Sequence, residues 1–219
     1  MTDEQVFWLS IGGFALLFML LMIAASKRSS KRQQIFSRVA QELGFQDIRR
    51  SWLFGAGVRA AWNGYPVRLY LLGRYKSMPE RILTRITLQS PGRILITRRS
   101  GKMMSKPFTL FGPPLVTPMT SGAAERFWIR SDQPAFVERL FASHDLAPLL
   151  DRNLIERFDL VDLGAKALVI RRATDLREVR ARYGIGMINF KADLSYVEAI
   201  AREEWALATL IIRELSLRP

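Results

Sequence analysis

The stretch GVRAAWNGYPVRLYLLG at residues 57–73 decides the fold of this chain. Apolar and polar residues alternate on both sides of its centre, which is the pattern of strands with one buried face. The residues expected on that face are Val58, Ala60, Trp62, Val67, Leu69 and Leu71. The two strands are separated by Asn63-Gly64, a pair that tolerates the positive φ angles of a tight turn. The stretch therefore predicts an antiparallel β-hairpin.

Strand patterns recur on the C-terminal side of this hairpin. RILTRITLQ at 81–89, the turn SPG and RILITRR at 93–99 predict a second pair of strands. ERFWIR at 125–130 predicts one more strand, and FDLVDL at 158–163 with KALVIRR at 166–172 predicts another hairpin. We therefore expect at least four antiparallel strands.

Helical patterns lie before, between and after these strands. Residues 30–43 place apolar side chains on one stripe. Pro134 suits the first turn of a helix that continues to about residue 143, and a second helix follows between 146 and 157. Asp193 caps a long C-terminal helix with one apolar side. The predicted domain is of the α+β class, with antiparallel hairpins packed against helices, the long C-terminal helix among them.

The N-terminus carries a different signal. VFWLSIGGFALLFMLLMIAA at 6–25 has Ser10 as its only polar side chain, and twenty helical residues span about 30 Å, the thickness of a bilayer core. A buried core helix and a cleaved signal peptide are the alternatives. A signal peptide fits less well because Asp3 and Glu4 make the leading segment acidic. The run predicts a single N-terminal transmembrane helix followed by an α+β cytoplasmic domain.

Charges flanking the run predict its orientation. Lys and Arg follow it directly, and such residues stay on the cytoplasmic side of a span. We expect an inner-membrane, single-pass protein with its N-terminus outside and residues 27–219 in the cytoplasm. The expected membrane-interface anchors are Phe7, Trp8, Lys27, Arg28, Lys31 and Arg32. A notch formed by Ser10, Gly12 and Gly13 is a candidate contact for a partner helix, with tolerated glycine composition as the alternative.

These patterns divide the chain into four segments. The predicted segments are a transmembrane anchor at 1–28, a juxtamembrane amphipathic helix at 29–44, a basic β-rich lobe at 45–120 and an α+β lobe at 121–219. One compact cytoplasmic domain is preferred, and two lobes divided near residue 121 are the alternative.

The net charge of +13 lies entirely in the first half of the chain. Residues 1–120 hold 18 Lys plus Arg against 5 Asp plus Glu, whereas residues 121–219 hold 15 of each. This distribution predicts a surface facing anionic lipid or a partner, with Arg59, Arg68, Arg74, Lys76, Arg98, Arg99 and Lys102 as its candidate residues. A wider set adds Arg81, Arg85, Arg93 and Lys106. Solvated strand residues without a partner are the alternative for each position.

Residue chemistry gives no catalytic, cofactor-binding or metal-ligating assignment. The chain has no Cys and one His, so thiolate nucleophiles and His-rich metal clusters are excluded. His144 follows a predicted helix end, where a capping or surface role fits better than that of a general base. Gly55, Gly57 and Ala60 match a loose dinucleotide fingerprint, but a turn arrives where the fingerprint requires a helix.

Nucleic-acid binding is a lesser alternative, because aromatic and basic residues interleave in one segment. Single-strand binders stack bases on aromatic rings within a basic groove. The residues concerned are Trp52, Trp62, Tyr65, Tyr70 and Tyr75 with Arg59, Arg68 and Arg74. The signature of an RNA-binding sheet is absent, and the predicted span already explains the charge.

The preferred hypothesis is a non-enzymatic accessory subunit that stabilises a larger bacterial-type membrane protein complex on its cytoplasmic side. This organisation is similar to that of the H subunit of purple bacterial photosynthetic reaction centres, which has one N-terminal span followed by a mostly β cytoplasmic domain. The resemblance covers layout only, and no residue role follows from it. Expected partners are a bilayer with anionic head groups and other integral membrane proteins. A stand-alone membrane-anchored scaffold or anionic-lipid-binding domain is the main alternative, and an enzyme with an unrecognised site is a further one.

Overall fold

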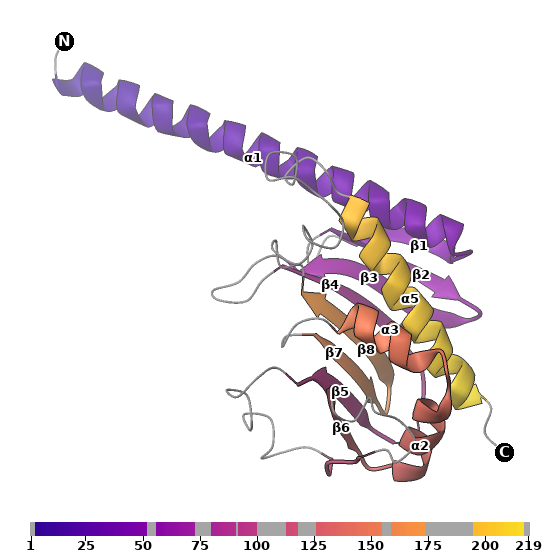
Figure 1. The fold of residues 1–219 in the computed structure, drawn as a ribbon. Helices are drawn as coiled ribbons and strands as arrows, with labels where there is room; N and C mark the ends of the chain where they lie inside the picture. Colours follow the sequence, from indigo (N-terminus) through magenta and orange to yellow (C-terminus); the bar gives the residue numbers. More distant parts are fainter. Residues whose placement is uncertain are drawn as a thin grey trace.

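The computed structural model describes residues 3–51, 56–72, 80–90, 92–99, 113–117, 126–154, 159–173 and 195–216. Within the first helix it describes side chains at residues 13, 14, 16–20 and from 30 onward. Helices α1 (Asp3–Glu42), α2 (Pro134–Ala142), α3 (Leu146–Asn153) and α5 (Ser195–Ser216) accompany one sheet (Figure 1).

Eight strands form a single antiparallel sheet in the order β1-β2-β3-β4-β8-β7-β5-β6. The strands are β1 (Gln46–Ser51), β2 (Gly57–Trp62), β3 (Tyr65–Leu72), β4 (Arg81–Thr87), β5 (Ile94–Arg98), β6 (Phe127–Ser131), β7 (Leu160–Gly164) and β8 (Ala167–Ala173). The predicted turn between β2 and β3 is confirmed, since Asn63 and Gly64 have φ angles of 47° and 81°.

The predicted pairing of residues 81–89 with 93–99 is wrong. Strand β4 pairs with β3 and β8, whereas β5 pairs with β6 and β7. The β7–β8 hairpin lies between β4 and β5, and the amides of Leu88 and Ser90 donate to Lys166 and Ala165 at its turn. Strands from either side of residue 120 are therefore neighbours in one sheet: β4 pairs with β8, and β5 pairs with β6 and β7.

The helices cover one face of the sheet. Helix α5 crosses β4 and β8, the C-terminal part of α1 lies over β1 and β2, and α2 and α3 pack beside α5 (Figure 1). Trp205 of α5 contacts Phe45 and Trp62 edge-on, at ring-centroid distances of 4.5 and 5.0 Å. Buried residues of both layers form one contiguous core, and this packing provides most of the apolar burial that holds the domain together.

Helix α1 corrects the expectation for the N-terminus. It runs without a break for 40 residues, about 60 Å at 1.5 Å per residue, and so joins the predicted span at 6–25 to the predicted amphipathic helix at 29–44. In the described part of the chain, no helix is both long and apolar enough to cross a membrane.

The predicted fold class, with a single N-terminal transmembrane helix, is therefore wrong, and so is the single-pass membrane topology. The expectation rested on the length of the apolar run, but the helix that contains it continues through a charged, glutamine-containing segment and packs on the sheet through Phe36, Val39 and Ala40. What the structure shows is an antiparallel eight-stranded sheet with helices on one face.

Candidate functional site

A row of four arginines crosses the sheet face opposite the helices. Arg49 of β1 lies directly opposite Arg59 of β2, Arg59 opposite Arg68 of β3, and Arg68 opposite Arg85 of β4. Strands lie 4.7–4.9 Å apart, so the row extends over about 14 Å of the sheet. We call these four residues the arginine row.

The strand alternation explains why the four side chains share one face. Arg59 follows Val58 and Arg68 precedes Leu69, and both apolar neighbours are buried under the helices. Successive residues of a strand point to opposite faces, so the arginines point away from the core. All four are exposed. None of them forms an ion pair or a side-chain hydrogen bond within the described residues.

The arginine row is electrostatically unfavourable in isolation, since like charges directly opposite each other destabilise a strand pair. Val169 of β8 is the next residue along the same line, and only beyond it does an acidic residue follow, Asp162 of β7. Asp162 is itself 3.5 Å from the guanidinium of Arg93. The protein therefore keeps four neighbouring positive charges without an internal counter-charge among the described groups.

Further positive charge lies beside the row on the same face. Arg171 of β8 is directly opposite Leu83 and diagonal to Arg81 of β4. Burial lowers the pKa of Arg171, and the nearby Arg81 lowers it further, while Asp159 and Asp162 act in the opposite direction. Two further cations, Arg81 and Arg171, therefore lie on the same face as the row.

A cavity of about 270 Å³ opens beside the row. Its described lining residues are Ser51, Val58, Arg68, Tyr70, Leu72 and Arg85. Gly57 of β2 lies directly opposite Tyr70, and a Cβ at Gly57 would be 2.5 Å from the Tyr70 Cβ. A residue without a side chain is therefore needed where β2 and β3 meet beside the cavity.

The predicted basic surface is only partly assembled. Arg59 and Arg68 belong to the arginine row, but Arg98 donates to the Leu154 carbonyl at 2.9 Å. Arg99 donates to the Phe127 carbonyl at 3.1 Å and stacks over the Trp128 ring at 4.2 Å. These two arginines hold neighbouring segments together. The remaining candidates, Arg74, Lys76 and Lys102, lie outside the described residues.

Sequence reasoning did not single out the complete row. Arg85 belonged only to the wider basic set, although its place in RILTRIT, between the buried residues Thr84 and Ile86, is a strand signal for an outward side chain. Arg49 was missed because β1 was not predicted: five of its six residues are polar. Only the strand register shows that these four arginines lie directly opposite one another.

Of the predicted N-terminal anchors, the structure describes the side chains of Lys31 and Arg32. Lys31 is exposed, whereas Arg32 is half-buried and binds Glu80, with a nitrogen–oxygen distance of 2.8 Å. Tyr196 of α5 donates to Glu80 at 3.3 Å, and burial, followed by the charge of Glu80, raises the Tyr196 pKa to about 12. Arg32 thus ties α1 to the domain. The backbone of Phe7, Trp8, Lys27 and Arg28 is helical, but their side chains lie outside the described set.

The predicted helix-contact notch is only partly described. Gly13 is exposed, and a Cβ there would meet nothing within 4 Å. The side chains of Ser10 and Gly12 lie outside the described set, although both residues are in α1. Large apolar side chains around Gly13 are exposed, with Phe14 72% accessible and each of residues 16–20 more than half accessible.

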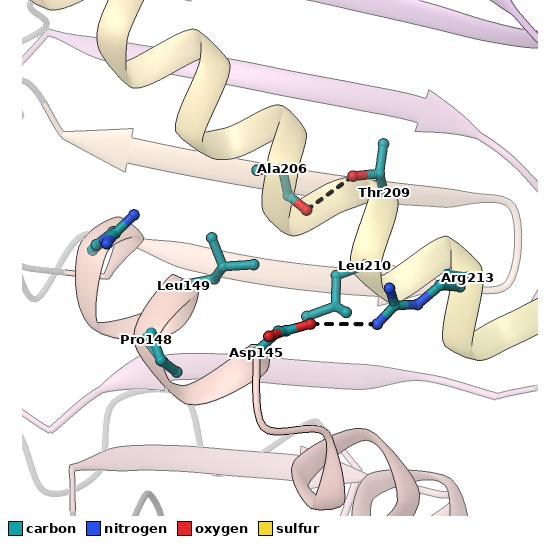
Figure 2. A pocket seen from close by; sticks show the side chains of 8 residues that line it. Asp145, Pro148, Leu149, Ala206, Thr209, Leu210 and Arg213 are labelled. Atoms are coloured by element: carbon teal, nitrogen blue, oxygen red, sulfur yellow. Dashed lines mark hydrogen bonds and ion pairs between the residues drawn. The ribbon is translucent and has the colours of Figure 1, made fainter.

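A second hollow, of about 430 Å³, lies between α3 and α5 (Figure 2). Arg213 reaches across it to Asp145 at 3.7 Å, and the Thr209 hydroxyl donates to the Ala206 carbonyl at 2.9 Å (Figure 2). Arg213 also pairs with Glu214, so the polar groups here bond one another. We therefore regard this hollow as a gap between helices, and the arginine row as the better candidate site.

A buried polar cluster lies between α5 and the sheet. Thr84 donates to the Glu204 carboxyl at 2.6 Å, and Arg172 binds Glu203 at 2.6 Å. Burial raises the Glu204 pKa to about 8. The hydrogen bond from Thr84 and the charge of Arg172 act in the opposite direction and reduce this rise. Glu204 is fully buried and so does not face solvent or either cavity. Within the described residues, no group of three His, Cys, Asp or Glu is placed to hold a metal ion.

The fold and the site define a class: an antiparallel sheet with helices on one face and a basic row on the other. No family model matches the chain, and the search of curated proteins gives no match. A solved structure, the crystal structure of the mycobacterial trehalose monomycolate transport factor A, TtfA, aligns with 10% sequence identity and a TM-score of 0.41. The alignment covers 78% of this chain and 95% of TtfA. At this similarity the likeness carries no argument about function.

Proposed function

We propose that this protein is a non-enzymatic binding module whose arginine row engages a phosphate-bearing anionic surface, namely the head groups of anionic lipids. The observation that carries the proposal is the direct register of Arg49, Arg59, Arg68 and Arg85, exposed and without internal counter-charges in the described structure. Guanidinium groups present several donors in a fork that matches phosphate oxygens. An array of phosphates would supply the counter-charges that the row lacks.

The distribution of aromatic residues favours lipid over single-stranded nucleic acid. A nucleic-acid binder needs exposed rings beside its cations for base stacking. Trp62 instead packs against Trp205 on the helix-covered face, and Tyr65 stacks on Trp62 at 6.4 Å. Of the five aromatic residues that interleave with arginine, Tyr70 is the one that the described structure places beside the row. Trp52 and Tyr75 lie outside the described residues.

Exposed apolar residues of α1 support the same choice. Residues 14 and 16–20 form an accessible apolar surface of the kind that marks contact with lipid or protein. A nucleic acid offers no comparable apolar surface to cover them. The proposal concerns binding at a lipid surface and requires no segment that crosses it.

Vesicle binding of the full chain tests the proposal. We expect cosedimentation with vesicles of phosphatidylcholine containing about one third phosphatidylserine, and little with phosphatidylcholine alone. One basic residue near an anionic surface contributes about 1 kcal/mol, so Arg59→Gln should weaken the partition coefficient about fivefold. High salt should weaken binding of the native protein as well.

The strand β1 offers a matched control. Arg50 is exposed like Arg49 but pairs with Val58, so it lies on the opposite face of the same edge strand. Arg49→Gln and Arg50→Gln remove the same charge from adjacent positions, and only the first should weaken vesicle binding. Equal losses, or equal binding to neutral and anionic vesicles, would show that net charge or apolar contact acts instead of the row. Tighter binding of an oligonucleotide than of anionic vesicles would favour the nucleic-acid alternative.

A further inference from the structure

The cavity beside the arginine row combines two kinds of wall. Arg68 and Arg85, which are directly opposed across β3 and β4, supply its charged side. Tyr70 and Leu72, the alternate residues after Arg68 on β3, continue the same face and supply an aromatic and an aliphatic side. Ser51 at the end of β1 adds a hydroxyl group. We call this hollow the Arg68–Arg85 cavity.

The charge of the cavity specifies an anion. No acidic residue lines it in the described structure, and its two guanidinium groups have no protein acceptor among the described residues. Two opposed guanidiniums suit a dianion better than a single charge, because each can give paired hydrogen bonds to two oxygens. A phosphate monoester carries about two negative charges near neutral pH and three free oxygens.

The volume of the cavity, and the side chains that line it besides the two arginines, restrict the organic part of the ligand. Sites for small molecules usually measure about 300–1,000 Å³, and this cavity is just below that range at about 270 Å³. One phosphate and a compact group fit such a volume. The hydroxyl groups of Ser51 and Tyr70 can exchange hydrogen bonds with ligand hydroxyls, while the Tyr70 ring and Leu72 pack against carbon atoms.

We infer that the Arg68–Arg85 cavity binds a single phosphate monoester carried by a small polyhydroxylated group. Arg68 and Arg85 hold the phosphate, and Tyr70 and Ser51 hold the hydroxylated part. The inference deepens the proposed function, because it assigns to one end of the arginine row a defined head-group site. The ligand chemistry is the same for a lipid head group and for a soluble phosphate ester.

Titration calorimetry of the full chain with glycerol 3-phosphate tests the cavity directly. We expect saturable binding that weakens at least tenfold in Arg68→Gln and in Arg85→Gln, and severalfold in Tyr70→Leu. Arg50→Gln is the matched control, because Arg50 is exposed on the opposite face of β1 and does not line the cavity. Thermal unfolding of each variant verifies that it is folded.

Vesicles distinguish the two ligand sources. Phosphatidylcholine vesicles carrying phosphatidylinositol 4-phosphate display a phosphomonoester, whereas phosphatidylserine vesicles of the same total charge do not. Preference for the former, lost in Arg68→Gln but kept in Arg50→Gln, supports the cavity and identifies lipid as the source. Binding of glycerol 3-phosphate with no vesicle preference supports the cavity with a soluble ligand.

The inference and the proposed function can fail separately. Absence of glycerol 3-phosphate binding together with no vesicle preference, or equal losses in Arg68→Gln and Arg50→Gln, would overturn the cavity assignment. Binding to phosphatidylserine vesicles that still depends on Arg49 and Arg59 would leave the proposed function standing. If vesicle binding is independent of the row while glycerol 3-phosphate binds through Arg68, the surface role is wrong and the cavity remains.

Discussion

Thr84 of β4 donates a 2.6 Å hydrogen bond to Glu204 of α5, deep between the long helix and the sheet. Both side chains are buried, and the other carboxyl oxygen of Glu204 has no hydrogen-bond partner among the described residues. Arg172, Glu203 and Asp159 are the charged groups nearest to it. Desolvation therefore dominates, and the Glu204 pKa rises from its ordinary value of 4.5 to about 8.

This relationship predicts that stability falls as pH rises from about 4.5 to 8. Within that window the folded state keeps a proton on Glu204 that the unfolded chain has lost, so raising the pH favours unfolding, by up to about 1.4 kcal/mol per unit. Glu204→Gln should remove this slope and leave the variant more stable than the native protein at pH 8. Urea unfolding at several pH values measures the effect.

Glu214→Gln is the control for the loss of one carboxylate from α5. Glu214 pairs with the exposed Arg213 and lies outside the buried cluster. The Glu214→Gln variant should therefore show the same dependence of the free energy of unfolding on pH as the native protein. Identical slopes in the native protein and in Glu204→Gln would show that Glu204 does not titrate in this way.

The arginine row predicts a stability gain on removal of charge. Arg59 is directly opposite two like charges, Arg49 and Arg68, and each such pair costs roughly 0.2–1 kcal/mol. Arg59→Gln should therefore raise the free energy of unfolding by about 1 kcal/mol at low salt. In 1 M salt the screening length is about 3 Å and the gain should largely vanish.

Thermal unfolding at 10 mM and 1 M sodium chloride measures this gain. Arg50→Gln, on the other face of β1, controls for the change in net charge and should be nearly neutral at both concentrations. A gain for Arg59→Gln that persists in 1 M salt would point to a cause other than charge repulsion.

Replacement of glycine by alanine should have opposite effects on stability at Gly57 and at Gly13. A Cβ at Gly57 would lie 2.5 Å from the Tyr70 Cβ and 2.6 Å from the Leu69 carbonyl oxygen, so β2 and β3 would have to separate. Gly57→Ala should destabilise the protein by about 1–3 kcal/mol. Gly13 of α1 has open space around it, and Gly13→Ala should be neutral or stabilising by up to about 1 kcal/mol. Urea unfolding of both variants gives the comparison, and a neutral Gly57→Ala would contradict the close approach.

Local patterns predicted the elements of this fold better than its long-range pairing. The β2–β3 turn follows from Asn63-Gly64 alone, and helix α2 begins at Pro134 as expected. The neighbours of β4 and β5 did not follow, because sequence alternation specifies which side chains point inward but not which strands pair. The position of the β7–β8 hairpin between them depends on pairs far apart in the sequence, such as Arg81 with Ala173 and Thr97 with Leu160.

The candidate site was incomplete for the same reason. Arg59 and Arg68 flank a recognisable turn, and both were expected on a basic surface. Arg49 depended on an edge strand whose single apolar residue, Ile48, gives no alternation to read. Arg98 looked equally basic, but its guanidinium serves a backbone carbonyl, which no local pattern reveals. The N-terminal span was predicted from the length of the apolar run, but no described helix is both long and apolar enough to cross a membrane.

The ion pair of Arg172 with Glu203 predicts a strong dependence of folding on one cation. The Arg172 side chain is 3% exposed, pairs with Glu203, and acts on the buried Glu204, which Asp159 also influences. Arg172→Gln leaves these acids without that charge and should cost about 3–5 kcal/mol. Urea unfolding measures the cost.

Two comparisons separate burial from charge at this pair. Arg126 pairs with Asp151 at the surface, with about half of its side chain exposed, so Arg126→Gln should cost at most about 1 kcal/mol. The double variant Arg172→Met with Glu203→Met removes both charges and replaces them with apolar side chains, and it should recover much of the loss. If the double variant is as unstable as Arg172→Gln, the cost arises from lost packing or from Glu204 and Asp159, and not from the uncompensated charge of Glu203.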